Sequence, residues 1–465
     1  MKKAILQIAL IALLSVGLSA FTGKAQEPEP ETPGAVFTFT TAAQVDQSIP
    51  VYLVYTGGLT IEGGTPESPL FEDAPEGADF YLKLSAQTVT IKGNISGIGL
   101  AEASLTGITF EPSPAVQLLD LQDNQLKEVP LDNLPNLQQL SLATNQLTSV
   151  ELSKLTKLES LDLSNNPITA LSIEGNSKLG TLYATNTGIS EFDLGTNTNL
   201  FDLNLSFTPL EKLTIPEGSD LFTLNVGSCA LSAIDLSRCL HLNALDISEN
   251  PIDDPDLSHN PELVFLTAVN CGLSKLNLSA NPLLAYLNCT ENQLTALDFS
   301  GNPGVASVSI YNNQIKGEQM KALVSSLPQE GTELPCFLYV INLEDEAEGN
   351  ICTNRQVKIA TDKGWEVKAL TADNIIDYEG SHEVGVCAPV APQPELCVYP
   401  TVAQSSVHVQ GGTPGALFNL LAADGSVVLH GQIPASGTLA LSVEHLPAGL
   451  YLFCTAQGTR RVRVE

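Results

Sequence analysis

A fixed interval of 21 residues organises most of the chain. Counting from Ile98, every twenty-first position up to Val308 carries an aliphatic side chain. The positions in this column are Ile98, Leu119, Leu140, Leu161, Leu182, Leu203, Leu224, Leu245, Leu266, Leu287 and Val308. Further columns, almost entirely aliphatic, lie two and seven residues after the first. A constant period of this length predicts a repeat protein in which each unit packs on its neighbours and none is stable alone.

The repeated pattern is L-x-L-x-x-N-x-L, and it resembles the leucine-rich repeats, whose fold is a solenoid of stacked coils. Because alternate side chains of a strand point to opposite faces, both leucines of L-x-L point into the coil. About ten residues later most units repeat the pair, for example at Val150 and Leu152. This nesting is similar to the short bacterial repeats called IRREKO. The resemblance implies a leucine-rich-repeat solenoid of parallel β structure with few helices.

An asparagine column lies five residues after the first aliphatic column. It comprises Asn124, Asn145, Asn166, Asn250, Asn292 and Asn313. A carboxamide inside the coil both donates and accepts hydrogen bonds, so it can pair backbone groups that the turn would otherwise leave buried and unpaired. We interpret the column as a structural ladder, with ligand binding as the alternative. Cys229 and Cys271 occupy the same column and are interpreted as small buried replacements.

The N-terminal part of the chain divides into four predicted segments. Residues 1–25 have the lysines, the apolar run over 4–21 and the small residues of a secretory signal peptide. Residues 26–34 form a Glu/Pro linker, and residues 35–97 predict a β-rich cap that shields the first coil. Eleven repeats occupy residues 98–316. No second apolar run is long enough to span a membrane, so we expect no transmembrane segment in the mature chain.

Residues 317–370 predict an α/β cap at the other end of the solenoid. Apolar residues at helical spacing predict a helix over 317–327, and Thr353 with Gln356 predicts a capping box that opens a second helix. Trp365 follows that helix, and we expect it in the core, with a binding role as the alternative. An Asp, Glu, Gly, Ala and Pro-rich linker is then predicted over 371–395.

Residues 396–465 carry short strand patterns and predict an all-β sandwich. This segment resembles the sorting domain of cargo proteins of the type IX secretion system. The matching residues are Val398-Tyr399-Pro400, Ala423-Asp424-Gly425, Leu446-Pro447-Ala448-Gly449-Leu450-Tyr451 and Arg460-Arg461-Val462-Arg463-Val464. The family usually has Asn-Pro after the opening Tyr-Pro and Lys near the terminus, where this chain has Thr401-Val402 and Arg. The resemblance implies an export address, and an ordinary β domain with its own ligand is the alternative.

The formal net charge of −31 limits the partners. Nucleic acid and anionic lipid both require a basic surface, so we expect neither as a partner, whereas a cationic partner suits the surface. Nine cysteines in an exported chain suggest disulfides. Cys229 and Cys271 are two coils and about 10 Å apart, too far to bridge. The predicted candidate pairs are Cys336 with Cys352 and Cys387 with Cys397.

A candidate binding surface follows from strand geometry. Residues one before, one after and three after each first-column position point outward and line a surface roughly 50 Å long. Most are small and polar, and the candidate ligand-binding residues are Tyr183, Phe265, Val269, Tyr286, Asn288, Thr290 and Tyr311. Exposed aromatics are enriched where proteins meet partners. The alternative is that the C-terminal cap covers the late aromatics and makes them local core.

The sequence contains no recognised catalytic or metal-binding motif. The histidines have no metal-ligand spacing, no Gly-x-Ser-x-Gly elbow occurs, and the acidic run from Asp253 to Asp256 lacks the spaced ligands of a calcium loop. We therefore expect no enzyme activity, no metal and no cofactor.

The favoured hypothesis is an internalin-like leucine-rich-repeat protein, secreted or on the outer-membrane cell surface, that recognises a protein or glycan. The partner is expected on another cell or in a biofilm matrix, so that the protein serves adhesion, biofilm formation or host attachment and contributes to virulence. The export machinery is expected to act through the C-terminal domain. Fold alone does not establish this function. The alternatives are an acidic structural component of the surface or matrix, and an enzyme hidden in the N-terminal segment.

Overall fold

The structure is a computed structural model that divides near residue 382 into two compact units. It describes residues 34–329, 335–372, 374–381, 397–399, 402–403, 405–410, 413–422, 427–436, 438–455 and 458–464. The predicted signal peptide and all but the last residue of the first linker lie outside the described residues.

The first unit begins with a small antiparallel cap. Its strands are β1 (Ala35–Thr41), β2 (Ser48–Glu62), β3 (Gly64–Pro66), β4 (Ala74–Leu84), β5 (Thr88–Gly99) and β6 (Leu105–Phe110). Strand β5 pairs with β1 and β2, and β1 also pairs with β6, so that Phe37, Phe39 and Phe110 meet in the cap core. The end of β5 pairs in parallel with the first strand of the solenoid, which makes cap and solenoid one continuous sheet.

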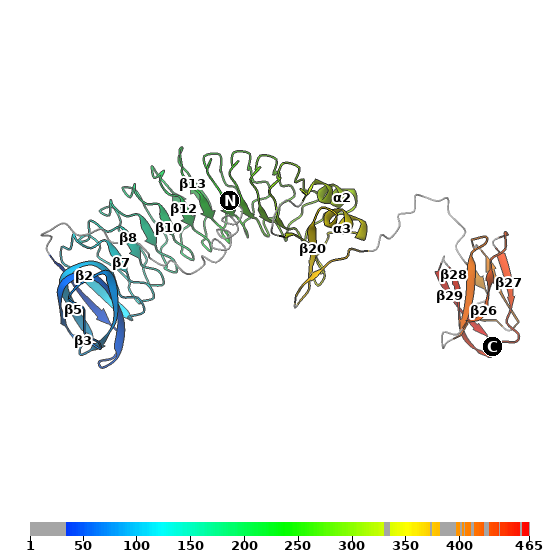
Figure 1. Ribbon diagram of the computed structural model, residues 1–465, viewed down its shortest axis with the longest axis horizontal. Coiled ribbons are helices and arrows are strands. Elements are labelled where there is room, and N and C mark those ends of the chain that lie inside the picture. The colour runs from blue at the N-terminus through cyan, green and yellow to red at the C-terminus, as the bar shows by residue number, and fades with distance from the viewer. Residues whose placement is uncertain are drawn as a thin grey trace. The chain divides into compact units, whose positions relative to one another are not determined.

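The solenoid is a parallel sheet of very short strands, one from each coil (Figure 1). These strands are β7 (Leu118–Asp120), β8 (Gln139–Ser141), β9 (Ser160–Asp162), β10 (Thr181–Tyr183), β12 (Asp202–Asn204), β14 (Thr223–Asn225), β15 (Ala244–Asp246), β16 (Phe265–Thr267), β17 (Tyr286–Asn288) and β18 (Ser307–Ser309). The pairing joins residues 21 positions apart, as at Leu119 with Leu140. The fold class is therefore the predicted leucine-rich-repeat solenoid.

The second half of each coil mostly forms turns. Only β11 (Glu191–Asp193) and β13 (Lys212–Thr214) pair as a separate two-stranded sheet among the described residues. The coil interior is nonetheless filled by both halves, since Leu152 of the second half belongs to the same buried core as Leu140 and Leu142 of the first. Figure 1 shows the strands along one side of the stacked coils and the turns along the other.

Each asparagine of the ladder makes several backbone hydrogen bonds inside its coil. Asn166 is typical: its Nδ2 donates to the carbonyl oxygens of Leu142 at 2.8 Å and Leu163 at 3.0 Å, and its Oδ1 accepts from the Leu147 N–H at 3.0 Å. The first of these bonds crosses to the preceding coil, so the column ties adjacent coils together. Cys271 replaces the donor in part, because its Sγ lies 3.2 Å from the carbonyl oxygen of Ile247.

The residue directly before the asparagine column has a left-handed backbone in every coil. Its φ lies between 51° and 58° at Asp123, Thr144, Asn165, Asn186, Phe207, Ser228, Glu249, Asn270, Glu291 and Asn312. This conformation turns the chain away from the sheet at the end of each strand. It is unfavourable for side chains branched or bulky near the backbone, such as those of Thr144 and Phe207. The sequence analysis did not predict this column.

The C-terminal cap continues the sheet and covers the end of the coil interior. Its elements are α2 (Gly317–Ser326), β19 (Cys336–Asn342), α3 (Asn354–Thr361), β20 (Trp365–Leu370) and β21 (Ile375–Asp377). Strands β19 and β20 add in parallel to β18, and β21 pairs antiparallel with β20. Gln356 Oε1 accepts from the Thr353 N–H at 2.8 Å at the start of α3, as the capping box predicts. Trp365 lies in the core, and its indole N–H donates to the Pro328 carbonyl oxygen.

Two details of this region differ from the sequence-based predictions. The cap extends beyond residue 370, because β21 belongs to its sheet and the Ser381 N–H donates to the Cys352 carbonyl oxygen. The predicted Cys336–Cys352 disulfide is not formed, since Cys352 is a buried free thiol. Cys352 precedes α3, whereas Cys336 pairs with the residue that opens β20 after α3.

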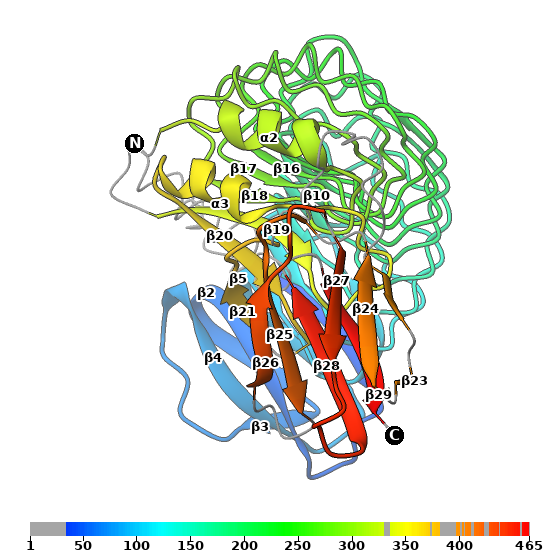
Figure 2. The ribbon, with the colours of Figure 1, turned by 90° about the vertical axis from the view of Figure 1, so that its right-hand side faces the viewer.

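The second unit is a β-sandwich. Its strands are β22 (Cys397–Tyr399), β23 (Val402–Ala403), β24 (Ser406–Gln410), β25 (Leu417–Ala422), β26 (Val427–Gln432), β27 (Thr438–Ser442), β28 (Gly449–Thr455) and β29 (Gly458–Val464). They form one sheet in the order β22-β24-β27 and another in the order β23-β29-β28-β25-β26. Figure 2 labels all of these strands except β22. Val407, Phe418 and Phe453 pack between the sheets. The Asp424-Gly425 turn, Cys387 and the Cys397 side chain lie outside the described residues.

Candidate functional site

The candidate site is the outer surface of the parallel sheet, called here the sheet face. It consists of the residues one before, one after and three after the buried middle residue of each solenoid strand, together with the residues of β19 and β20 that flank their buried residues. In β16, for example, Leu266 is buried while Phe265 and Thr267 are half-buried. The parallel register places equivalent residues of neighbouring coils side by side, which produces continuous rows across the face.

Aromatic side chains gather at the late end of the sheet face. Phe265 and Tyr286 are register partners, and their ring centroids lie 6.4 Å apart at an angle of 42°. Burial raises the pKa of Tyr286, and the neighbouring hydroxyls of Tyr311 and Tyr339 raise it further. Phe265, Tyr286 and Tyr311 are all half-buried, so they are neither core residues nor fully solvated.

Strand β19 contributes two aromatic residues that the sequence analysis missed. Phe337 pairs with Ser307 and Tyr339 with Ser309, which places both on the sheet face. Their rings stack with centroids 6.0 Å apart, and Lys368 Nζ lies 5.6 Å from the centre of the Phe337 ring. The aromatic patch is therefore defined as Phe265, Tyr286, Tyr311, Phe337 and Tyr339.

The C-terminal cap does not cover the aromatic patch. Strands β19 and β20 extend the sheet beside it, and Figure 1 shows α2 and α3 beside the turns instead of over the sheet face. All five patch side chains remain half-buried, whereas a covered cluster would be buried. The patch thus remains open to a partner.

The other predicted site residues differ in their exposure and in their distance from the aromatic patch. Val269 and Asn288 are half-buried on the sheet face beside the patch. Thr290 is buried, and its hydroxyl donates to Asn288 Oδ1 at 3.0 Å, so this hydroxyl already has a partner inside the fold and supports Asn288. Tyr183 lies several coils away from the patch, and its hydroxyl donates to Asp202 Oδ2 at 2.6 Å. Burial and this bond raise the pKa of Tyr183.

The early coils of the sheet face are acidic. Asp120 and Asp162 lie in the row after the buried residues, and Asp202 lies in the row before them. Burial raises the pKa of all three carboxyl groups, and in Asp120 the nearby charges of Asp123 and Asp162 add to the effect. Within the part of the chain that the structure describes, no ion pair joins these three carboxylates to Lys or Arg.

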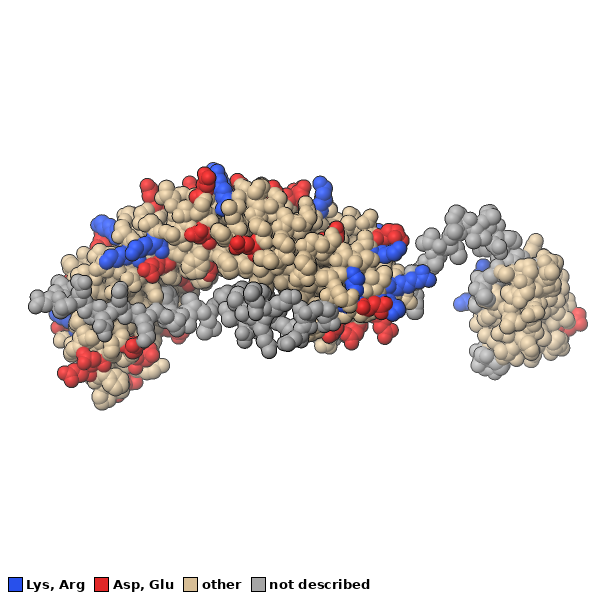
Figure 3. Space-filling model, turned by 45° about the horizontal axis from the view of Figure 1, so that its top comes forward, with Lys and Arg blue, Asp and Glu red and all other residues tan. Residues whose placement is uncertain are grey.

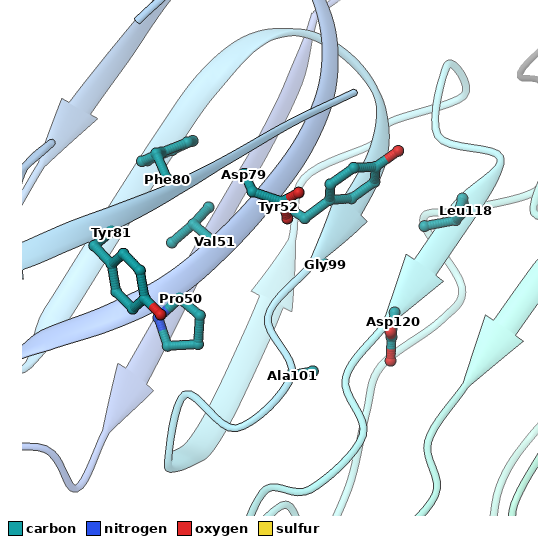
Figure 4. A pocket seen from close by; sticks show the side chains of 10 residues that line it. All are labelled: Pro50, Val51, Tyr52, Asp79, Phe80, Tyr81, Gly99, Ala101, Leu118 and Asp120. Carbon is teal, nitrogen blue, oxygen red and sulfur yellow. The ribbon is translucent and has the colours of Figure 1, made fainter. Parts of the chain in front are cut away.

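A pocket of about 500 Å³ lies where the N-terminal cap meets the first coil (Figure 4). Tyr52 and Asp79 stand on its cap side, and Leu118 and Asp120 of β7 stand on its solenoid side. Gly99 lies between Tyr52 and β7 in the sheet, and its missing side chain leaves the hollow. Figure 3 shows acidic side chains gathered over this cap, while most of the solenoid surface in that view is uncharged.

The raised pKa values predict a pH-dependent effect on stability. A carboxyl group whose pKa is raised by folding binds its proton more tightly in the folded state than in the unfolded state. At a pH above the raised pKa, the charged carboxylate therefore destabilises the fold. At a pH below the ordinary value of 3.8, the group is protonated in both states and has no such effect. The double variant Asp120→Asn, Asp162→Asn is therefore expected to melt at a higher temperature than the unmodified protein at pH 7. The difference should shrink as the pH falls toward 3.8.

The exposed residue Asp193 supplies the control for that measurement, because Asp193→Asn removes one charge without removing a buried one. Melting followed by circular dichroism at several pH values measures the effect. If the double variant is less stable than the unmodified protein at pH 7, burial of these carboxylates is not the dominant influence on them.

Other features of the described residues bear on the chemistry of the site. No group of three or more His, Cys, Asp or Glu residues among them is arranged to hold a metal ion. In the acidic run from Asp253 to Asp256, Asp254 pairs with Lys275 at 3.7 Å. No helix in the described ranges is long and apolar enough to cross a membrane. The site is thus an open sheet face of acidic and aromatic side chains on a leucine-rich-repeat solenoid.

Comparisons with known proteins agree with this fold class. Two family models described as leucine-rich repeat match residues 114–168 and 157–182. No curated protein is significantly similar in sequence.

Several solved structures resemble the chain. The functional domain of InlJ from Listeria monocytogenes, which includes a cysteine ladder, has a TM-score of 0.48 and 19% identity, over 80% of this chain and 81% of that one. The internalin InlF from Listeria monocytogenes has a TM-score of 0.45 and 20% identity, over 60% and 87%. The leucine-rich repeat domain of APL1 has a TM-score of 0.41 and 20% identity, over 48% and 68%.

Proposed function

We propose that this chain is a non-catalytic recognition protein that binds a protein or glycan through the sheet face of its solenoid. The observation that carries the proposal is the aromatic patch. Its five side chains are half-buried on the sheet face, where the Phe265 and Tyr286 rings and the Phe337 and Tyr339 rings form two neighbouring pairs. Aromatic side chains in such positions commonly supply most of the binding energy of an interface.

The proposed place of action is the bacterial cell surface or the surrounding medium. This part of the proposal is supported by sequence alone, namely the signal-like residues 1–25 and the resemblance of residues 396–465 to type IX sorting domains. The partner is then a protein or glycan on another cell or in a biofilm matrix, and the C-terminal unit is the part that the export machinery handles. The nested repeat class and the domain limits of the sequence analysis belong to the same proposal.

A comparison of two strains tests the proposed function. Bacteria that lack the gene are expected to lose attachment to other cells or to host cells. The purified full chain is expected to restore attachment of these bacteria, or to compete with attachment of the unmodified strain, with an effect that saturates at high concentration. Protease or glycosidase treatment of the target surface then distinguishes a protein partner from a glycan. If the chain instead binds all tested surfaces equally and salt abolishes this binding, the result would contradict specific recognition. It would support the alternative of an acidic structural component of the surface or matrix.

A further inference from the structure

A second site occupies the acidic end of the sheet face. In the parallel register of β7, β8 and β9, Asp120 pairs with Ser141 and Ser141 pairs with Asp162. Leu140 and Leu142, which flank Ser141, are fully buried in the coil. Ser141 therefore points to the opposite side of the strand, onto the sheet face between the two carboxylates.

Two buried polar oxygens of β8 have no hydrogen-bond partner in the described structure. The Ser141 side chain is 0% exposed, and its hydroxyl oxygen has no hydrogen-bond partner within the described structure. Gln139 Oε1, from the same strand, is buried without a partner as well. A buried polar atom without a partner is unfavourable by about 1–3 kcal/mol, which marks a position where a ligand improves the hydrogen bonding.

Each carboxylate is held by the turn that follows its strand, and Asp162 also has a hydrogen bond with the Ser164 side chain. Asp120 Oδ1 accepts from the Gln122 N–H at 3.1 Å, and Asp162 Oδ1 accepts from the Ser164 N–H at 2.9 Å. These bonds fix both side chains at the ends of their strands. The complementary group has several donors, carries positive charge and needs no acceptor, which describes the ammonium group of lysine.

The neighbouring pocket fits the aliphatic part of the same side chain. Tyr52, Gly99 and Asp120 follow one another in the row that continues to Ser141 and Asp162. A Cβ atom on Gly99 would lie 3.0 Å from the Cβ of Tyr52, so a side chain at this position would crowd the hollow. Figure 4 shows the Tyr52 ring and Leu118 on opposite sides of it, with Asp120 at the solenoid side. Lysine stems pack well along apolar walls of this kind.

We propose that Asp120, Ser141 and Asp162 bind the ammonium group of a lysine side chain from a protein partner, whose aliphatic stem lies between Tyr52 and Leu118. The inference rests on the proposed role of the sheet face in recognition and adds the chemistry of one contact. It places a charged contact at the early end of the face and the aromatic patch at the late end, so that an extended partner touches both.

Short peptides test this site without knowledge of the natural partner. The full chain is titrated calorimetrically with acetyl-Ala-Ala-Lys-Ala-Ala-amide and with the peptide that carries norleucine, which lacks the ammonium group, in place of lysine. Only the lysine peptide is expected to bind. Asp120→Asn and Asp162→Asn are each expected to weaken its binding at least about tenfold, because each removes a charged acceptor. Asp193→Asn, which removes an equal charge from an exposed strand, is expected to leave binding unchanged.

Ser141→Ala supplies a second readout. It is expected to weaken binding of the lysine peptide several-fold without lowering the melting temperature, because the hydroxyl it removes makes no bond in the fold. Equal affinity for the lysine and norleucine peptides, equal losses in Asp120→Asn and Asp193→Asn, or tighter binding of the corresponding arginine peptide would each overturn the proposal.

A further variant separates this proposal from the proposed function. Phe265→Ala with Tyr286→Ala leaves the lysine site intact, so it should bind the lysine peptide normally. If that variant also attaches to target cells normally, the role of the aromatic patch fails while the lysine site stands. If attachment depends on the patch but no lysine peptide binds, only the lysine site fails.

Discussion

Replacement of Asn166 by alanine is expected to lower the free energy of unfolding by about 3 kcal/mol or more. The side chain is buried, and the substitution removes the bonds of Nδ2 to Leu142 and Leu163 together with the bond that Oδ1 accepts from Leu147. The backbone groups of Leu142 and Leu147 are then left in the coil interior without a side-chain partner. Urea-induced unfolding followed by circular dichroism measures the loss.

The exposed residue Asn277 supplies the matched control. Its Oδ1 accepts one hydrogen bond, from the Ser279 N–H at 3.1 Å, and Asn277→Ala is expected to lower stability by no more than about 1 kcal/mol. Similar losses for the two alanine variants would contradict the structural role of the ladder. A large loss of ligand binding at full stability in Asn166→Ala would instead support the alternative that the column binds a ligand.

Replacement of Trp365 by alanine is expected to lower the free energy of unfolding by about 3–5 kcal/mol. The side chain is 1% exposed and is among the largest fully buried groups of the first unit. Its indole N–H donates to the Pro328 carbonyl oxygen at 2.9 Å, so Trp365→Phe, which keeps much of the packing, should have an intermediate effect. Far-UV circular dichroism suits the measurement, because the chain contains one tryptophan and both variants remove its fluorescence.

Ile351→Ala in the same cap is the control, because Ile351 is exposed and its loss should change stability little. If Trp365→Ala unfolds like the unmodified protein but no longer binds a partner, Trp365 is a binding residue and not part of the core.

The repeat could be predicted from the sequence because its cause is local and periodic. Each L-x-L pair must be buried and each asparagine must satisfy buried backbone groups, so both requirements appear as columns at a constant interval. The same reasoning predicted α2 and α3, since helical spacing and the Thr353–Gln356 pair are also local patterns.

The features that sequence analysis missed depend on breaks in the period or on conformation without a fixed residue type. Phe337 and Tyr339 lie on the sheet face because β19 pairs with β18, where Leu338 is the register partner of Val308. These partners are more than 21 residues apart in the sequence, so counting by the repeat does not find them. The left-handed position before the asparagine column carries Thr, Phe, Ser and Glu as well as Asn and Asp, so composition does not reveal it. The sequence analysis also missed that Thr290 donates inward to Asn288, a bond that Ser206 makes to Asn204 in an earlier coil.

The central claim is that the aromatic patch of the sheet face is the surface that recognises a partner. Its most direct test measures binding of the purified full chain to target cells for the variant Phe265→Ala, Tyr286→Ala. The matched control is Phe71→Ala, Phe207→Ala, which removes two more strongly exposed rings outside the patch, 72% and 63% exposed. The account predicts at least about tenfold weaker binding for the patch variant alone, with at most a small fall in melting temperature. Equal binding by the two variants, or unfolding of the patch variant, would contradict it.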